Sequence, residues 1–147
     1  MLRQTVDRCP EDVWVGGAHP RNFWRIAYHA IYYTHLYAHQ GEEDYVPWAK
    51  ERSDVRVLWA TPPVEEPYSK SEMLEYIDLV DCAIDGLVDS LDLEAEKCGF
   101  SWYSLCKLEH QLLNLRHLQG HVGQLSELLH ANGVDTDWKG SAKSAKG

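Results

Sequence analysis

The chain has 147 residues, a formal net charge of −9 at pH 7 and 44% hydrophobic residues. This length fits one ordinary domain, and the hydrophobic content excludes wholesale disorder. The acidic balance, with no basic stripe and no apolar run near the roughly 20 residues of a membrane span, argues against nucleic-acid and membrane partners.

A short helical segment is expected at the N-terminus, and a second one directly after it. Residues 1–8 can form a short helix or the tail of one. Pro10 followed by two acids is typical of a helix start, because Pro needs no amide partner there and the acids meet the positive end of the helix dipole. Gly16 and Gly17 then interrupt the helical pattern.

The segment from Asn22 to about His39 predicts a long helix. It contains no Gly or Pro and begins shortly after Pro20. Its apolar and aromatic residues lie on nearly every face of the helix: Phe23, Trp24, Ile26, Tyr28, Ile31, Tyr32, Tyr33, Leu36 and Tyr37. A helix that is apolar all round is buried on several sides, so this one is expected at the centre of the fold.

A long connection follows over residues 41–68. It contains four prolines and is expected to lack regular structure, apart from one short strand or helical turn near residues 53–58. Connections of this length in a compact domain usually cover a functional site, or cross from one end of a bundle to the other.

The clearest helix begins after Ser69. Ser69 and Glu72 have the spacing of a capping box, in which each side chain satisfies an amide at the start of the helix. The acids of this helix mostly lie off its apolar stripe and are expected to face solvent. The stripe indicates packing against other helices, and it consists of Met73, Ile77, Val80, Ile84, Leu87 and Leu91.

A last helix is predicted from about Ser104 to Ala131, with Asn132 and Gly133 as its stop signal. The tail over residues 135–147 is rich in Gly, Ser, Ala and Lys and is expected to be flexible. Helices without a convincing strand indicate an all-α fold, namely an antiparallel four-helix bundle with one long crossover connection. A single domain is expected over residues 1–134.

The aromatic and cysteine contents add two expectations. Six Trp and eight Tyr stand against two Phe, and the polar tips of Trp and Tyr favour pocket walls and interfaces over a dry core. The four cysteines show no CxxC spacing and no preceding signal peptide. Free thiols in a reducing cytosol are therefore expected, and with them a cytoplasmic location.

Eight histidines raise the question of a metal site. Two pairs have the i,i+4 spacing that puts both rings on one helix face, His35 with His39 and His117 with His121. On the last helix, His117 and His121 share the inward stripe with leucines. A buried imidazole needs hydrogen-bond partners or a metal, and two rings one turn apart can converge on one ion. This pair therefore favours a metal site over two satisfied core histidines.

A third ligand should come from a facing helix, and His29 in the aromatic helix is the candidate. His35 and His39 point away from His29 and are interpreted as a surface or interface pair, with a rival metal site as the alternative. His110 lies nearly two turns before His117 and is expected at the mouth of the pocket. Three imidazoles leave one coordination position open, which is the arrangement of a catalytic site that can activate water or a thiol.

Two segments resemble the DinB-like superfamily: Asn22-Phe-Trp-Arg-Ile-Ala-Tyr-His29 and Asn114-Leu-Arg-His117-Leu-Gln-Gly-His121-Val-Gly-Gln124-Leu. The resemblance covers about residues 1–138. It implies a four-helix bundle, often dimeric, in which His29, His117 and His121 hold a divalent metal. Zinc and nickel are the implied ions, with manganese or iron as further options. Relatives in this superfamily include transferases and isomerases that use a low-molecular-weight thiol.

Several further residues are expected around the metal. Tyr32 or Tyr33 could donate a proton or a hydrogen bond to a substrate, although packing is the more frequent role of a buried tyrosine. Asn114 and Gln124 are expected to orient the imidazoles. The sequence shows no evident protein nucleophile.

Three functional hypotheses follow. The first is a metal-dependent hydrolase or thiol transferase that acts on a small-molecule substrate such as a low-molecular-weight thiol, as a homodimer. The second is a non-catalytic, stress-related protein that binds a metal or a small molecule. The third is a structural helical dimer with polar core histidines. The open coordination position favours the first, whereas the missing H-E-x-x-H pattern favours the second, since Leu118 follows His117.

Overall fold

The computed structural model describes residues 1–59 and 66–138, and within these ranges the chain is entirely helical, with no strand. The all-α prediction is therefore confirmed for this part of the chain. The helices are α1 (Leu2–Arg8), α2 (Glu11–Trp14), α3 (Phe23–Tyr37), α4 (Lys70–Asp89) and α5 (Lys107–Ala131), and two 3-10 turns span Glu42–Asp44 and Ser53–Val55.

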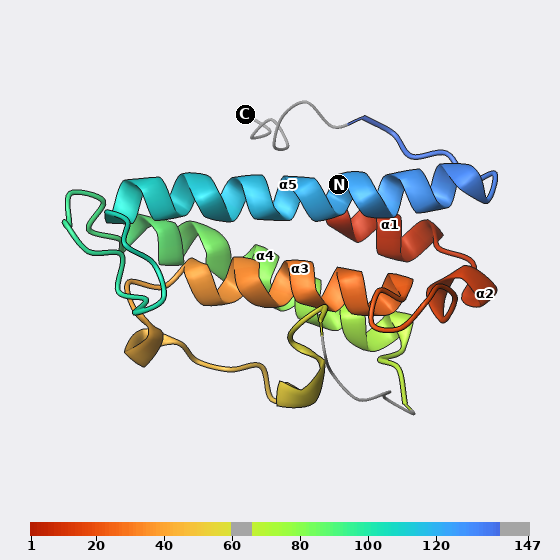
Figure 1. The fold of residues 1–147 in the computed structure, drawn as a ribbon, viewed down its shortest axis with the longest axis horizontal. Coiled ribbons are helices and arrows are strands. Elements are labelled where there is room, and N and C mark those ends of the chain that lie inside the picture. Colours follow the sequence, from red (N-terminus) through yellow and green to blue (C-terminus); the bar gives the residue numbers. More distant parts are fainter. Residues whose placement is uncertain (60–65, 139–147) are drawn as a thin grey trace.

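Three long helices make up most of the fold, with α3 between the other two. In Figure 1, α3 and α4 run in the same direction and α5 runs in the opposite one. The short helix α1 packs against both α4 and α5. The chain returns from the end of α3 to the start of α4 through the predicted long connection. The expected bundle of four antiparallel helices is not confirmed, since α1 has only seven residues and α3 and α4 are parallel.

The aromatic character of α3 has the predicted consequence. Every residue of this helix except Tyr33 is buried. Rings from the long connection and from α4 cover its outer side: Tyr28 lies 4.8 Å from Tyr68, and Trp48 stacks on Tyr76 at 4.6 Å between ring centroids. Such ring pairs add to the free energy gained from burying their apolar area. The centre of the molecule is thus a layer of packed aromatic rings around α3.

Helix α4 begins as its sequence predicts. The backbone amide of Glu72 donates to the Ser69 hydroxyl, and the amide of Ser69 donates to the Glu72 carboxylate, which completes the capping box. The first half of the apolar stripe is buried, while the stripe residues after Val80 are only half-buried. An ion pair of 3.0 Å between Arg3 and Asp78 places α1 beside this first half. The short α1 therefore accounts for the difference between the two halves of α4.

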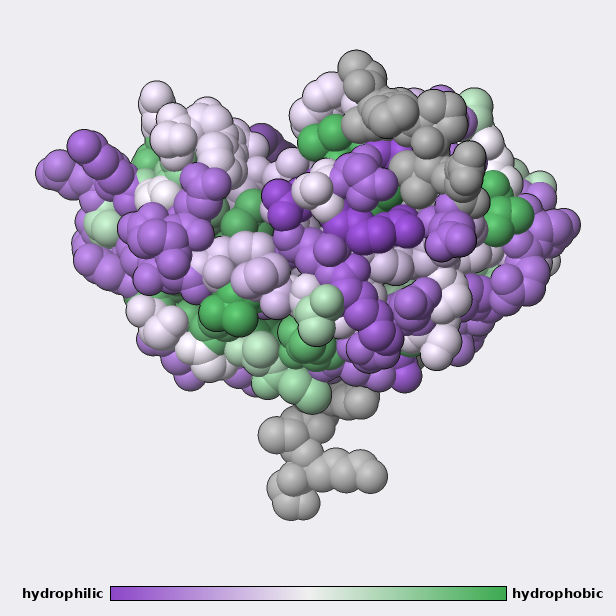
Figure 2. Space-filling model, turned by 90° about the horizontal axis from the view of Figure 1, so that it is seen from below, coloured by the Kyte–Doolittle hydropathy of each residue, from purple (hydrophilic) through white to green (hydrophobic). Residues whose placement is uncertain are grey.

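The surface and the C-terminal segment complete the fold. None of the described helices combines the length and apolar character needed to cross a membrane. Figure 2 shows hydrophilic side chains over most of one face, with separate hydrophobic patches between them.

Asp137 reaches back to pair with Arg8 on α1. The rest of the tail that was expected to be flexible, residues 139–147, lies outside the described residues.

A buried lysine joins the first turn of α5 to the end of α3. The Lys107 side chain is 0% exposed, and its ammonium group donates hydrogen bonds to the backbone carbonyls of His39, Gln40 and Cys98. Neutral carbonyls can satisfy a buried cation when several of them converge on it. This contact fixes where α5 begins relative to α3.

Candidate metal centre

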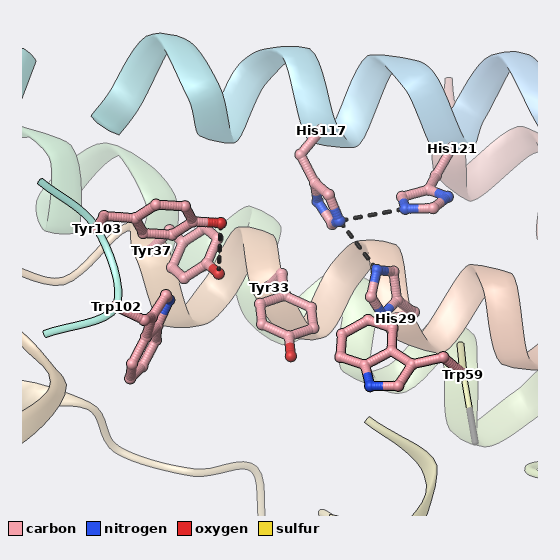
Figure 3. A pocket seen from close by; sticks show the side chains of 8 residues that line it. All are labelled: His29, Tyr33, Tyr37, Trp59, Trp102, Tyr103, His117 and His121. Carbon is pink, nitrogen blue, oxygen red and sulfur yellow. Dashed lines mark hydrogen bonds between the residues drawn. The ribbon is translucent and has the colours of Figure 1, made fainter. Parts of the chain in front are cut away.

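Three histidines from two helices meet at the contact between α3 and α5. His29 lies in the middle of α3, and its side chain is buried because α5 packs directly on this part of α3. His117 and His121 lie one turn apart on α5 and are half-buried. Figure 3 shows the three rings directed toward a common point. Their predicted convergence is therefore present in the structure.

The ring nitrogens of the three histidines are very close together. The Nε2 atom of His117 lies 3.0 Å from Nε2 of His29 and 3.1 Å from Nε2 of His121. One ligand atom from each residue falls within 4.8 Å of the other two, and no other set of three such groups in residues 1–59 and 66–138 does so. Three imidazoles at one point can hold a divalent metal ion.

The outer nitrogens of two rings fix which nitrogen carries the proton. Nδ1 of His29 lies 2.7 Å from the backbone carbonyl oxygen of Arg56, which can only accept, so Nδ1 is the donor. Nδ1 of His121 lies 2.9 Å from Oε1 of Gln124, and the guanidinium of Arg21 donates to that same oxygen. The neutral rings of His29 and His121 therefore both direct an unprotonated Nε2 at the cluster.

This proton arrangement fits a metal ion better than a closed hydrogen-bond network. His117 can supply one N–H to only one of the two bare nitrogens, and its own Nδ1 is buried without a partner among the described residues. The other bare nitrogen would then lack a donor, whereas a cation at the common point can be bound by both lone pairs. Metal–nitrogen bonds of about 2.0–2.1 Å in a tetrahedral site separate the ligand atoms by roughly 3.3 Å, close to the spacing observed here.

Burial keeps all three rings in the neutral form that binds metals. It lowers the pKa of His29 to about 3 and that of His117 to about 4, and it also lowers the pKa of His121. The neighbouring imidazoles of the cluster act in the same direction for His29 and His117, because a second positive charge nearby would be unfavourable.

A chain of polar contacts supports His29 from behind. Arg56, whose carbonyl receives the His29 proton, pairs through its guanidinium with Glu51. Glu51 in turn accepts a hydrogen bond from the Tyr45 hydroxyl. The Arg56 guanidinium also lies 5.1 Å from the centroid of the Tyr32 ring. The long connection therefore orients a histidine of α3, which is the role of partners behind metal ligands.

A pocket of about 500 Å³ opens beside the histidines. Its wall is aromatic and comes from three parts of the chain. Tyr33 and Tyr37 lie on α3, Trp59 lies on the long connection, and Trp102 and Tyr103 lie just before α5. Apart from Tyr33, none of these five residues stands out in the sequence. The only signal was the excess of Trp and Tyr over Phe.

A glycine lets the segment before α5 approach the pocket. Gly99 has a φ of +84°, and a Cβ atom there would lie 2.2 Å from the backbone oxygen of Gln40. The Gly99 carbonyl also accepts a hydrogen bond from the amide of Glu42 at 3.2 Å. Only glycine fits this conformation and this close contact, which brings Trp102 and Tyr103 against the end of α3.

The structure gives distinct places to the residues expected around the metal. Gln124 holds His121, as described above, and Tyr33 lines the pocket with its hydroxyl directed away from the histidines in Figure 3. Asn114 instead donates to the backbone oxygen of Thr34, at 3.3 Å. Tyr32 contacts Arg56 and does not line the pocket.

His35 and His39 are buried, so their interpretation as a surface or interface pair is wrong. His35 Nδ1 lies 3.1 Å from the Tyr76 hydroxyl, and Nδ1 of His39 donates to the backbone oxygen of His35 at 2.9 Å. The ring of Tyr45, from the long connection, packs within 5.4 Å of both imidazoles. Neither His35 nor His39 belongs to a group of three potential metal ligands among the described residues.

His110 is 0% exposed and lies behind the pocket wall, so it is not a residue of the pocket mouth. Its ring stacks on Phe100 at 4.8 Å and contacts Tyr37 at 4.6 Å and Tyr103 at 5.4 Å between centroids. Neither ring nitrogen has a hydrogen-bond partner among the described residues. Burial, and then the nearby charge of Lys107, lower the pKa of His110 to about 4.

We expect His110→Phe to reduce the acid sensitivity of folding. The unfolded chain takes up this proton near pH 6.5, whereas the folded protein does so only near pH 4. Stability should therefore fall by about 3 kcal/mol from this group as the pH drops across that window. Urea unfolding at pH 7 and pH 4.5, with chelator present, measures the difference between wild type and variant. An equal loss in both would contradict the prediction, and the exposed His130→Phe serves as the control.

Comparisons of the chain with models of protein families, with curated proteins and with solved structures found no match. The function therefore has to be inferred from the site itself.

Proposed function

We propose that the chain binds one divalent metal ion through His29, His117 and His121 and presents its open coordination position to the aromatic pocket. The observation that carries this proposal is the meeting of three Nε2 atoms, two of which are unprotonated because their rings donate through Nδ1 to fixed oxygens. Three neutral nitrogen ligands suit zinc or nickel best, with manganese or iron as further options.

The open position gives the site a catalytic character. A bound divalent ion would lower the pKa of a coordinated water or thiol and would polarise a substrate group beside it. The protein residues hold the ligand rings in place and line the pocket beside them with aromatic rings. No carboxylate lines the described pocket, so a proton acceptor for the activation of water is missing there. This favours a thiol transferase over a hydrolase, since a thiol ionises more readily than water.

The resemblance of two segments to the DinB-like superfamily agrees with this proposal. It assigns the metal to His29, His117 and His121, and it implies a four-helix bundle, often dimeric, and a low-molecular-weight thiol as co-substrate. The alternative is a non-catalytic, stress-related protein that binds a metal or a small molecule. The lack of a proton acceptor in the pocket is the observation that favours this alternative.

Elemental analysis tests the metal proposal directly. We expect about one zinc or nickel ion per chain in protein purified without a metal column, and almost none in His117→Ala. The exposed His130→Ala should keep the wild-type content. An equal and substoichiometric content in all three proteins would reject the site.

A second assay separates a transferase from a binding protein. Metal-loaded protein is incubated with a low-molecular-weight thiol and an electrophile, and adduct formation is followed. We expect turnover above that of the variant in which all three histidines are Ala. A full metal content without any such turnover would support the non-catalytic alternative.

A further inference from the structure

The described wall of the pocket is aromatic and carries no formal charge. Beside the three histidines, its lining consists of two tryptophans and three tyrosines. The two tryptophans flank the pocket from opposite sides in Figure 3, with Tyr33 between them. Among residues 1–59 and 66–138, no Asp, Glu, Lys or Arg lines the pocket.

The rings form a continuous surface that leads to the metal ligands. Centroid distances are 6.4 Å from Trp102 to Tyr103, 5.9 Å from Tyr103 to Tyr37 and 5.3 Å from Tyr37 to Tyr33. Tyr33 then lies 4.7 Å from the ring of His29. Neighbouring rings of this series are tilted by 50–77° to one another, so a planar molecule placed here would stack on one ring, meet the edges of others and have one edge close to the histidines.

The two tryptophans are unusually accessible. Trp59 is 61% exposed and Trp102 is 49% exposed, although Trp is highly buried on average in folded proteins. Leaving such large apolar side chains in water forfeits the free energy of burying them, at about 25 cal/mol per Å². A ligand between them would recover part of this free energy. Exposed apolar surface of this kind commonly marks a binding groove.

The charge around the pocket selects among ligands that bind aromatic walls. Aromatic cages also bind quaternary ammonium ions, but a divalent cation at the histidines would repel such a ligand, and no carboxylate of the lining offsets this repulsion. A highly charged ligand would leave its charges unpaired against the rings. An uncharged ring with one anionic donor group has neither problem.

We infer that the pocket binds a small aromatic molecule whose ring lies against the wall of tyrosines and tryptophans and whose single metal-binding group reaches the three histidines. This inference deepens the proposed function and rests on it, because the metal anchors one end of the molecule. The pocket volume of about 500 Å³ is adequate for such a ligand.

Two hydroxamates that share one metal-binding group test the ring preference. We expect zinc-loaded protein to bind benzohydroxamate at least about 10-fold more tightly than acetohydroxamate in isothermal titration calorimetry, as stacking of about 1.4 kcal/mol would give. In the double variant Trp59→Ala with Trp102→Ala, the preference should fall below about 3-fold, because benzohydroxamate binding weakens more than acetohydroxamate binding. Trp138→Ala is the matched control, since Trp138 is 78% exposed and does not line the pocket.

The possible outcomes distinguish failure of the inferred ring preference from failure of the proposed metal site. Equal affinities for the two hydroxamates in zinc-loaded wild type would overturn the inference and leave the metal site intact, as would an unchanged preference in the double variant. If the protein takes up no zinc, the proposed function fails. The wall is then tested alone, by binding of 4-methylphenol against 4-methylcyclohexanol to the metal-free protein, and equal affinities would overturn the inference there too.

Discussion

Zinc is expected to raise the unfolding temperature of the metal-free protein by about 10 °C, and this rise should be absent in His117→Ala. A ligand that binds only the folded state stabilises it by about 4 kcal/mol at a thousandfold excess over its Kd. For a domain of this size, 1 kcal/mol corresponds to roughly 2–4 °C in Tm. His117 is the informative position because its Nε2 contacts both of the other rings.

A comparison of wild type and His117→Ala without a metal provides a second and sharper test. Without a metal, His117 lies between two unprotonated nitrogens and leaves its own Nδ1 unpaired, so its removal should cost little stability. Wild type and His117→Ala should then unfold at similar temperatures in chelator and separate only when zinc is added. Calorimetric scans with zinc and with chelator measure this, with His130→Ala as the control. Identical melting of wild type in both conditions would contradict the metal site.

Lys107→Met is expected to destabilise the metal-free protein by about 3 kcal/mol. Methionine has a similar length but no donors, so the carbonyls of His39, Gln40 and Cys98 would lose their shared partner inside the protein. Each buried and unsatisfied polar group costs about 1–3 kcal/mol, and the loss of a buried charge offsets part of the sum.

Urea unfolding with chelator present checks this prediction. Lys97→Met is the matched control, since Lys97 is exposed and lies in the same segment before α5. The control should change the free energy of unfolding by less than about 0.5 kcal/mol, as is usual for surface substitutions. A loss of less than 1 kcal/mol in Lys107→Met would show that water or a shift of the backbone satisfies the three carbonyls.

Local sequence signals were sufficient for the long helices and for the shared face of the two histidines on α5. The capping box of Ser69 and Glu72 fixes the start of α4 through contacts within four residues. Likewise, His117 and His121 are placed by helix periodicity, and the apolar surroundings of His29 point to a buried, central helix. These features depend on short-range geometry, whereas the meeting of His29 with the two histidines of α5 depends on how the helices pack.

The pocket wall and the other buried histidines could not be predicted in the same way. Trp59 and Trp102 lie in irregular segments, whose position depends on long-range contacts rather than on any period. His35 and His39 have the same i,i+4 spacing as His117 and His121, but Tyr45 from the long connection covers them. Whether an outward-looking helix face meets solvent or a returning loop is decided by tertiary packing alone.

The lysine contact at the start of α5 also limits how α3 and α5, which carry the three histidines, can move relative to each other. Sliding α5 along α3 by one residue, about 1.5 Å, would pull the Lys107 ammonium away from its carbonyls. The same sliding would separate His117 from His29, so the axial register of the helices and the spacing of the imidazoles are coupled. A contact outside the histidine cluster therefore holds the distance between the imidazole nitrogens of α3 and α5 constant.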